Sequence, residues 1–361
     1  MAKKTNNQKS LPVISQEAIS LLEKLSNAMG VSGNELEIRV IIKEELSSFA
    51  DSLKTDALGN LIAIKKAKTP NPLRVMVAAH MDEVGFMLVE KDSDGIFKFQ
   101  VVGGIDDRSL AGKPVQVGKN HAPGVIGACP VHLSTKAERE VILKSNALRI
   151  DTGPGSSGVN TGDYATFATQ FQVMGESFSG KALDNRIGVA TLIQLFKNAP
   201  ENIELIAAFT VQEEVGLRGA AAAAYNLAPD FAFVIDCTPA NDQQPWDGSE
   251  NTLYRTRLDH GPAIYTKDSA TLYDRRLIRY MSDLAEKFGI KYQFRQPTTG
   301  GTDAGAIHLS RAGIPTLSVS VPGRYAHTAA MIVRKSDWEG FFQLMTVALE
   351  NISADILKEQ R

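Results

Sequence analysis

Three short and nearly continuous apolar segments each end in a histidine or an acidic residue. These segments and the residues that follow them are 74–79 with His80, 203–211 with Gln212-Glu213-Glu214, and 231–235 with Asp236. Apolar runs of this length are typical of strands that are buried on both faces of a sheet. Because helices must then cover both faces, the segments predict an α/β fold with a mostly parallel sheet.

Apolar positions at helical spacing lie before, between and after these segments. They predict helices over residues 14–29, 34–49, about 185–198, 217–227, 271–288 and 335–357. In the second helix, Ile38, Ile42, Leu46 and Phe49 fall on one face. In folds where strands and helices alternate, ligands bind beyond the carboxyl ends of the strands.

Between about residues 83 and 175 the pattern of apolar residues and turns is different. Short strand-like pieces are separated by glycine-rich turns, and there is one short helical candidate near 135–144. The pieces are residues 84–90, 96–102, 114–118 and 164–173. This pattern predicts a small antiparallel β-barrel, residues 83–175, inserted into a catalytic domain of residues 1–82 and 176–361.

Composition narrows the class of protein. The 361 residues are 43% hydrophobic and 22% charged, as in a soluble globular enzyme. A net charge of −2 gives no basic field for nucleic acid or a membrane surface, and no apolar run reaches the roughly 18 residues of a membrane helix. The two cysteines, Cys129 and Cys237, match no metal or redox spacing, which favours reduced thiols in the cytoplasm.

Each polar residue at a strand end has an ordinary explanation as well as a chemical one. His80 could be a hydrogen-bonded polar cap, but Asp82, two residues later, could accept the proton of its second ring nitrogen, as metal sites require. Asp184 precedes an apolar helix and could be its N-cap. Asp236 follows a hydrophobic strand, where an unpaired carboxylate would be costly.

The adjacent pair Glu213 and Glu214 is harder to explain without a cation. Two carboxylates at the end of so apolar a run would repel each other and lose hydration. A metal lets one of them act as a ligand while its neighbour takes a proton from water.

Histidine and carboxylate ligands together suit zinc, cobalt or manganese better than calcium. One bridging carboxylate with two further ligands for each metal would hold two ions about 3.5–4 Å apart.

Six segments resemble the glutamyl aminopeptidases, also called tetrahedral aminopeptidases. They are A-H-M-D-E-V-G-F (79–86), G-K-A-L-D-N-R-I-G (180–188), Q-E-E-V-G-L-R-G (212–219), V-I-D (234–236), G-G-T-D-A-G-A-I-H (300–308) and R-Y-A-H (324–327). The resemblance extends in order from about residue 15 to the C-terminus. It implies an aminopeptidase that hydrolyses the N-terminal residue of short peptides with two divalent metal ions.

The resemblance also implies a role for each residue. His80, Asp184 and Asp236 would bind one metal, and Asp184, Glu214 and His327 the other. Glu213 would be the general base, and Asp82 would orient His80. The peptide bond between Asp184 and Asn185 would be cis. The inserted barrel would be a dimerisation domain, and dimers would assemble into a hollow homododecamer.

Substrate preference stays open. Arg255, Arg257 and Lys267 could form a basic pocket for acidic N-terminal residues, or only a solvated loop, which leaves a broad or apolar preference as the alternative.

Two other readings are weaker. A glycoside hydrolase also uses paired carboxylates, but neighbours on a strand, such as Glu213 and Glu214, should point to opposite faces. The pattern G-P-G-S-S-G at 153–158 opens no predicted helix and is not a dinucleotide motif. The histidines expected to be structural or on the surface are His121, His132, His260 and His308.

Overall fold

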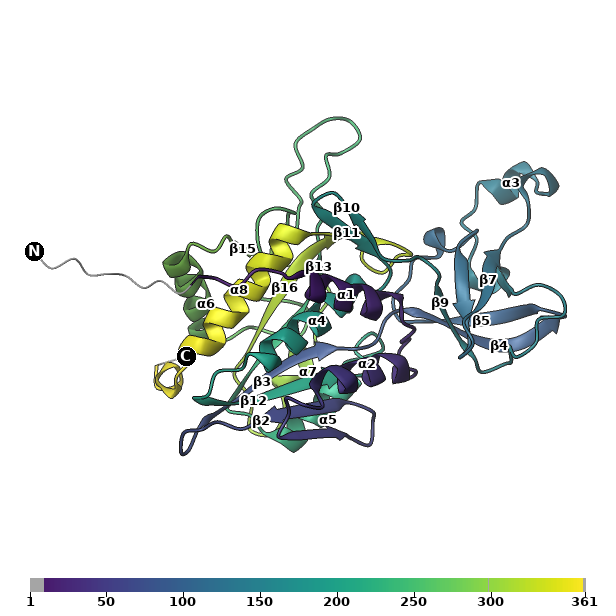
Figure 1. Ribbon diagram of the computed structural model, residues 1–361. Coiled ribbons are helices and arrows are strands. Elements are labelled where there is room, and N and C mark those ends of the chain that lie inside the picture. Colours follow the sequence, from purple (N-terminus) through teal and green to yellow (C-terminus); the bar gives the residue numbers. More distant parts are fainter. Residues whose placement is uncertain (1–9, 298, 360–361) are drawn as a thin grey trace, which may run out of the picture.

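The computed structural model describes residues 10–297 and 299–359. Figure 1 shows a large α/β part beside a smaller β-barrel, joined by the chain on either side of the barrel. A mostly parallel sheet and a separate closed antiparallel barrel confirm the predicted fold class.

The large part is built on one mixed sheet, in the order β1-β2-β12-β3-β13-β16-β17-β11-β10. Its strands are β1 (Ser52–Thr55), β2 (Leu61–Lys65), β3 (Leu73–His80), β10 (Gln172–Met174), β11 (Ser177–Gly180), β12 (Ile203–Thr210), β13 (Phe231–Pro239), β16 (Thr316–Arg324) and β17 (Met331–Arg334), with the short β14 (Ala263–Ile264) and β15 (Gln293–Phe294) beside them. The four central strands, β12, β3, β13 and β16, are parallel, so their carboxyl ends meet at one edge.

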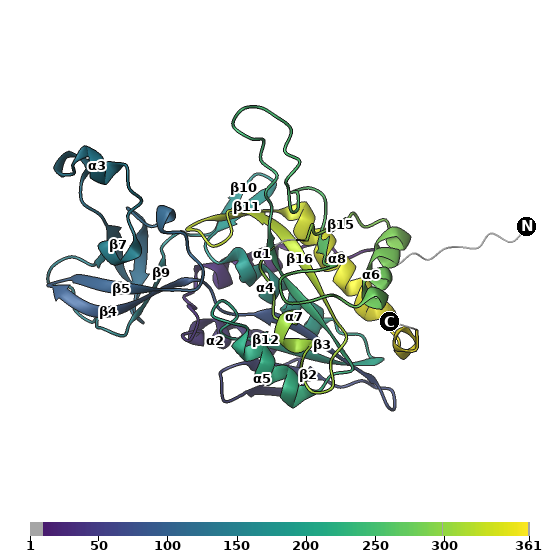
Figure 2. The same cartoon turned by 180° about the vertical axis from the view of Figure 1, so that it is seen from behind.

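Helices cover both faces of this sheet, as its fully buried central strands require. The helices are α1 (Gln16–Asn27), α2 (Leu36–Leu46), α4 (Leu183–Lys197), α5 (Arg218–Leu227), α6 (Arg275–Phe288), α7 (Ala304–Ile307) and α8 (Lys335–Asn351). Figure 1 shows α1, α4 and α8 in front of the sheet, and Figure 2 shows α5 and α7 on the opposite face. Helix α4 is the central one, since it packs on β3 and β13 and against α1 and α8.

The barrel closes in the order β4-β5-β8-β7-β6-β9. Its strands are β4 (Gly85–Ser93), β5 (Ile96–Val102), β6 (Pro114–Val117), β7 (Ala122–Gly127), β8 (Arg149–Asp151) and β9 (Tyr164–Phe167). Phe86, Phe97 and Phe99 are buried in the barrel core, where Phe86 packs edge-to-face on Phe99 and Phe167.

Several expected elements differ in extent. The piece expected at 164–173 is two strands, β9 in the barrel and β10 in the main sheet. The helical candidate near 135–144 is only α3 (Lys136–Arg139), and the last helix ends at Asn351, before a short 3₁₀ turn (Ala354–Leu357). Phe49 lies beyond α2 and is exposed, so it does not extend the buried face of that helix. None of the helices in the described part of the chain has the length and apolar character needed to cross a membrane.

Candidate metal centre

The carboxyl edge of the parallel strands brings His80 and Asp236 together. Strand β3 ends at His80, and the neighbouring parallel strand β13 carries Asp236. His80 Nε2 lies 3.4 Å from Asp236 Oδ1, and both side chains are almost fully buried. The strand pattern in the sequence therefore placed this pair at the correct edge.

Asp184 approaches the same histidine from the start of α4. The backbone there is not helical at Asp184 and Asn185, and the peptide bond between them is cis, as the resemblance implied. Asp184 Oδ1 lies 3.3 Å from His80 Nε2. Asn185 Oδ1 accepts a hydrogen bond from the backbone N–H of Gly188 at 3.1 Å, so Asn185, and not Asp184, caps the regular part of the helix.

Glu214 and His327 complete the cluster on the side facing the barrel. His327 Nε2 lies 3.3 Å from Glu214 Oε1 and 3.7 Å from Asp184 Oδ2. Both residues lie outside regular structure, Glu214 in the turn after β12 and His327 in the turn after β16. Nothing in their local sequence pattern indicated that these two turns meet.

Two overlapping groups of possible ligands share Asp184. In the first (His80, Asp184, Asp236) and the second (Asp184, Glu214, His327), one ligand atom from each residue lies within 4.8 Å of the others. A third such group consists of His80, Glu213 and Glu214. Imidazole and carboxylate donors in this arrangement fit two neighbouring divalent cations of the zinc, cobalt or manganese type.

The charges of the cluster also fit bound cations. Burial raises the pKa of Glu213 well above its ordinary value, raises the pKa of Glu214 to about 8, and raises the pKa of Asp236. Burial lowers the pKa of His80, but hydrogen bonds to Asp184 and Asp236 outweigh it and raise that pKa well above 6.5. So many buried carboxylates are not stable as anions together unless positive charge lies among them.

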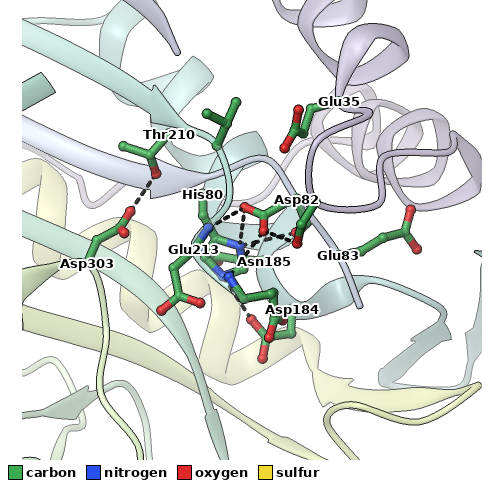
Figure 3. A network of polar contacts seen from close by, with 12 residues as sticks. Glu35, His80, Asp82, Glu83, Asp184, Asn185, Thr210, Glu213 and Asp303 are labelled. Carbon is green, nitrogen blue, oxygen red and sulfur yellow. Dashed lines mark hydrogen bonds and ion pairs between the residues drawn. The ribbon is translucent and has the colours of Figure 1, made fainter. Parts of the chain in front are cut away.

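Asp82 lies on the other side of His80 (Figure 3) and joins two parts of the site. His80 Nδ1 is 3.1 Å from the backbone oxygen of Asp82 and 3.6 Å from its carboxylate, so the backbone oxygen is the nearer partner. The carboxylate accepts hydrogen bonds from the backbone N–H groups of Glu213 and Glu214, at 3.0 and 3.1 Å, and from Ser32 Oγ at 2.6 Å. Asp82 therefore orients the turn of both glutamates as well as the histidine.

The barrel contributes a backbone group to the cluster that the sequence did not reveal. His327 Nδ1 lies 2.8 Å from the carbonyl oxygen of Gly104, just after β5. The Nδ1–H donates to this carbonyl, which leaves Nε2 free to bind a cation. Gly103, with φ +85°, leaves the backbone room here, since a Cβ would lie 2.7 Å from Val84 and 3.4 Å from Glu214.

Glu213 and Glu214 do not alternate as neighbours on a strand would. Strand β12 ends at Thr210, and both glutamates lie in the following turn, where each offers an oxygen within 4.8 Å of His80 and of the other. The expectation that they point to opposite faces was wrong, because the apolar run continues beyond the last residue of the strand and the glutamates are not part of it. Figure 3 shows the Glu213 carboxylate directed toward the same space as that of Asp184.

A cavity of about 450 Å³ opens beside the cluster and is lined by its residues. Arg255 and Arg295 also line it, whereas Arg257 stacks on Tyr254, 3.7 Å from the ring centre, and Lys267 does not line it. Arg295, which no sequence pattern singled out, is buried, and its Nη1 has no hydrogen-bond partner among the described residues.

One further buried carboxylate borders the cluster. Asp303 accepts a hydrogen bond from Thr210 Oγ1 at 2.5 Å, and burial raises the pKa of Asp303 to about 7. The residue lies within the motif at 300–308, but the sequence gave it no role. Within the described residues, the other histidines, His121, His132, His260 and His308, join none of the possible ligand groups.

Comparison with known proteins agrees with the resemblance. Residues 59–344 match the family of M42 glutamyl aminopeptidases. A putative aminopeptidase of Acetivibrio thermocellus is 37% identical over 340 residues, which cover 92% of this chain and 99% of that protein.

Two solved structures are similar along almost their full length. An aminopeptidase of Desulfurococcus kamchatkensis is 30% identical, with a TM-score of 0.88 and coverage of 95% of this chain and 97% of that one. The TET1 peptidase of Pyrococcus horikoshii, described as able to assemble into a tetrahedron or a large octahedral shell, is 36% identical, with a TM-score of 0.82 and coverage of 93% and 100%. The chain therefore belongs to the M42 glutamyl aminopeptidase family.

Proposed function

We propose that the protein is an aminopeptidase that removes the N-terminal residue of short peptides with the help of two divalent cations. Zinc or cobalt suits the donors best, and manganese is the further choice. The observation that carries the proposal is the pair of ligand groups joined by the shared Asp184. When bound, the two cations would polarise the scissile carbonyl and lower the pKa of the attacking water.

In this proposal, five side chains hold the cations. His80, Asp184 and Asp236 bind one, and Asp184, Glu214 and His327 bind the other. Asp82 fixes the orientation of His80, and the Gly104 carbonyl fixes that of His327, as the outer partners of metal-binding histidines commonly do.

Glu213 is the general base of the proposed reaction. Its carboxylate lies beside the ligand groups, so it accepts a proton from the water that attacks the scissile carbonyl and then delivers this proton to the leaving amine nitrogen. The hydrogen bond from its backbone N–H to Asp82 holds the turn in place during both steps.

Acidic N-terminal residues are the substrates that the cavity favours. Arg295 is buried beside the ligand groups, with one guanidinium nitrogen unpaired among the described residues, and Arg255 lines the same wall. A substrate carboxylate in the cavity would pair with the guanidinium groups that line this wall. Arg257 and Lys267, expected in the same pocket, lie outside this wall.

We further propose that the chain forms a cytoplasmic homododecamer built from dimers, with the barrel as the dimerisation domain. The barrel segment around α3 protrudes in Figure 1. It exposes apolar side chains that a partner subunit would cover. These are Val131, Leu133, Val141 and Ile142. Light scattering is the test: an active monomer would refute self-association, and an active dimer would refute only its last step.

The proposed activity is tested with a panel of aminoacyl chromogenic substrates and full-length protein. Activity should be lost in a chelator and return when zinc or cobalt is added back, with the glutamyl and aspartyl substrates cleaved fastest. Chelator-resistant activity would contradict the metal requirement. A preference for leucyl substrates would contradict only the acidic specificity.

A further inference from the structure

A second cluster of charges, fully buried, lies next to the proposed metal centre. Glu83 Oε1 lies 2.9 Å from Lys181 Nζ and 3.0 Å from Arg186 Nη2, and all three side chains are at most 4% exposed. In the described part of the chain, no other acidic side chain forms an ion pair with Lys181 or Arg186. We call these three residues the Glu83 triad.

The two cationic residues of the triad lie on either side of Asp184 in the sequence, the residue that the two metals would share. Lys181 is three residues before Asp184 and Arg186 is two residues after it. The backbone between them is irregular, with Ala182 at φ +53° and Asp184 in a non-helical conformation. One helical hydrogen bond crosses this segment, from the backbone N–H of Arg186 to the carbonyl of Ala182 at 3.0 Å. The two ends of the segment are also attached, through the long side chains of Lys181 and Arg186, to the carboxylate of Glu83.

The carboxylate itself is held from three directions. Glu83 Oε1 also accepts a hydrogen bond from the backbone N–H of Gly30, at 2.9 Å, and Oε2 accepts one from Thr166 Oγ1 of β9, at 2.7 Å. A Cβ at Gly30 would lie 2.5 Å from Arg186 Nη2, so only glycine lets the guanidinium reach this position. The anchor thus combines the loop after α1, a barrel strand and α4.

The triad and the metal centre share a wall. A small cavity of about 20 Å³ is lined by Glu83 and Lys181 and also by Asp184, Glu214 and His327. Hence no complete layer of side chains separates the triad from three of the proposed ligands. Figure 3 shows Glu83 directed away from His80, so the carboxylate belongs to the triad and not to the ligand groups.

From this geometry we propose that the Glu83 triad positions Asp184 for metal binding, and that Lys181 and Arg186 are positioning residues of the centre. The proposal rests on the function proposed above. Glu83 fixes both cationic side chains, these fix the segment 181–186, and the segment presents Asp184 to both ligand groups. The negative charge of Glu83 is essential here, because an uncharged side chain could not stabilise the buried positive charges of Lys181 and Arg186.

Lys181→Met is the decisive variant, since it keeps most of the length of the side chain, removes its charge and leaves the Glu83–Arg186 pair intact. The zinc affinity of the full-length protein, measured by competition with a chromogenic chelator, should fall by about 10- to 100-fold, as for other residues that support metal ligands. Lys181→Arg restores the charge and should recover most of this loss.

Lys197→Met is the matched control. It is the same substitution at the other end of α4, and it breaks the ion pair of Lys197 with Glu45. The control should bind zinc as the wild type does, whatever happens to its melting temperature. Zinc affinity of Lys181→Met equal to that of the control would overturn the proposal.

Two further outcomes are informative. If Lys181→Met does not fold, Thr166→Val takes its place, because it removes one hydrogen bond to Glu83 and leaves both ion pairs. Its zinc affinity should fall by at least about threefold, because a threefold change corresponds to only part of the free energy of one hydrogen bond. An unchanged zinc affinity would overturn the proposal. A wild-type protein that binds no zinc, cobalt or manganese would overturn the proposed function together with the role of the triad.

Discussion

Asp82 accepts a hydrogen bond from the backbone N–H of Glu213, at 3.0 Å, while its own backbone oxygen lies 3.1 Å from His80 Nδ1. Asp82 thus holds both the proposed base, in the turn after β12, and the first proposed ligand, at the end of β3. Their relative position does not depend on a bound substrate.

This relationship predicts the behaviour of Asp82→Asn. The amide keeps one acceptor oxygen, but its NH₂ group would face a backbone N–H of Glu213 or Glu214, so the turn of the two glutamates should shift. We expect kcat at saturating zinc to fall by about 10- to 100-fold, the usual effect of losing an outer partner in a metal site. The control is Asp337→Asn, since Asp337 also accepts two backbone hydrogen bonds, from Asp259 and Gly261, but belongs to none of the possible ligand groups among the described residues. Equal kcat in both variants would contradict the role of Asp82.

Glu213→Gln separates proton transfer from metal binding. The substitution keeps the size of the side chain and removes the proton acceptor, so turnover should fall by at least about 100-fold, while metal content stays unchanged. Metal content is measured by elemental analysis of the same samples used for kinetics. The control is Glu204→Gln, at the start of β12, the strand that precedes the turn of Glu213. It breaks an ion pair with Arg74 and should leave turnover intact. Near-normal turnover of Glu213→Gln at full metal occupancy would exclude it as the base.

Arg295→Leu tests the acidic preference. Because the guanidinium lies in the wall of the cavity, its loss should lower kcat/KM for a glutamyl substrate relative to a leucyl substrate by about 10-fold or more. Arg295 also contacts Thr238 and the ring of Tyr265, so the ratio of the two substrates, and not the absolute rate, is the measurement. Arg257→Leu, outside the cavity wall, should leave this ratio unchanged. An unchanged ratio in Arg295→Leu would show that acidic side chains bind elsewhere.

A fourth prediction concerns stability and pH. Burial raises the pKa of Asp337 from 3.8 to about 6. The folded protein therefore holds this proton more tightly than the unfolded chain, and the free energy of unfolding should fall as the pH rises from about 4 to 6. Relative to Asp337→Asn, the free energy of unfolding of the wild type should fall by about 2–3 kcal/mol over this range. Above a pH of about 7 it should fall no further. Urea unfolding at a series of pH values measures the difference, and parallel curves would disprove it.

The sequence predicted those parts of the site that depend on strand ends. His80 and Asp236 follow apolar runs that had to be buried parallel strands, and the carboxyl ends of such strands share an edge. Asp184 and His327 lie in irregular backbone, and only resemblance to a family pointed to them. The contact between His327 and Gly104 joins residues 223 positions apart, so no local pattern contains it.

The errors have a similar physical origin. The apolar run of β12 extends past the last strand residue, Thr210, because Val211 is buried without being in the sheet, and this misplaced the two glutamates on the strand. Glu83 lies within the motif at 79–86, but its ion pairs are with Lys181 and Arg186, about 100 residues later in the chain, so the local sequence did not reveal them.

The hydrogen bond from His327 to the Gly104 carbonyl also limits how the two parts of this protein can diverge. A chimera that carries the barrel of another protein would fold both parts and still lack a correctly oriented histidine, unless the transplanted turn presented a carbonyl at the same place. Replacement of the barrel by a plain linker would have the same effect. Insertions should therefore be tolerated at the far end of the barrel, around α3, and rejected at the turn after β5.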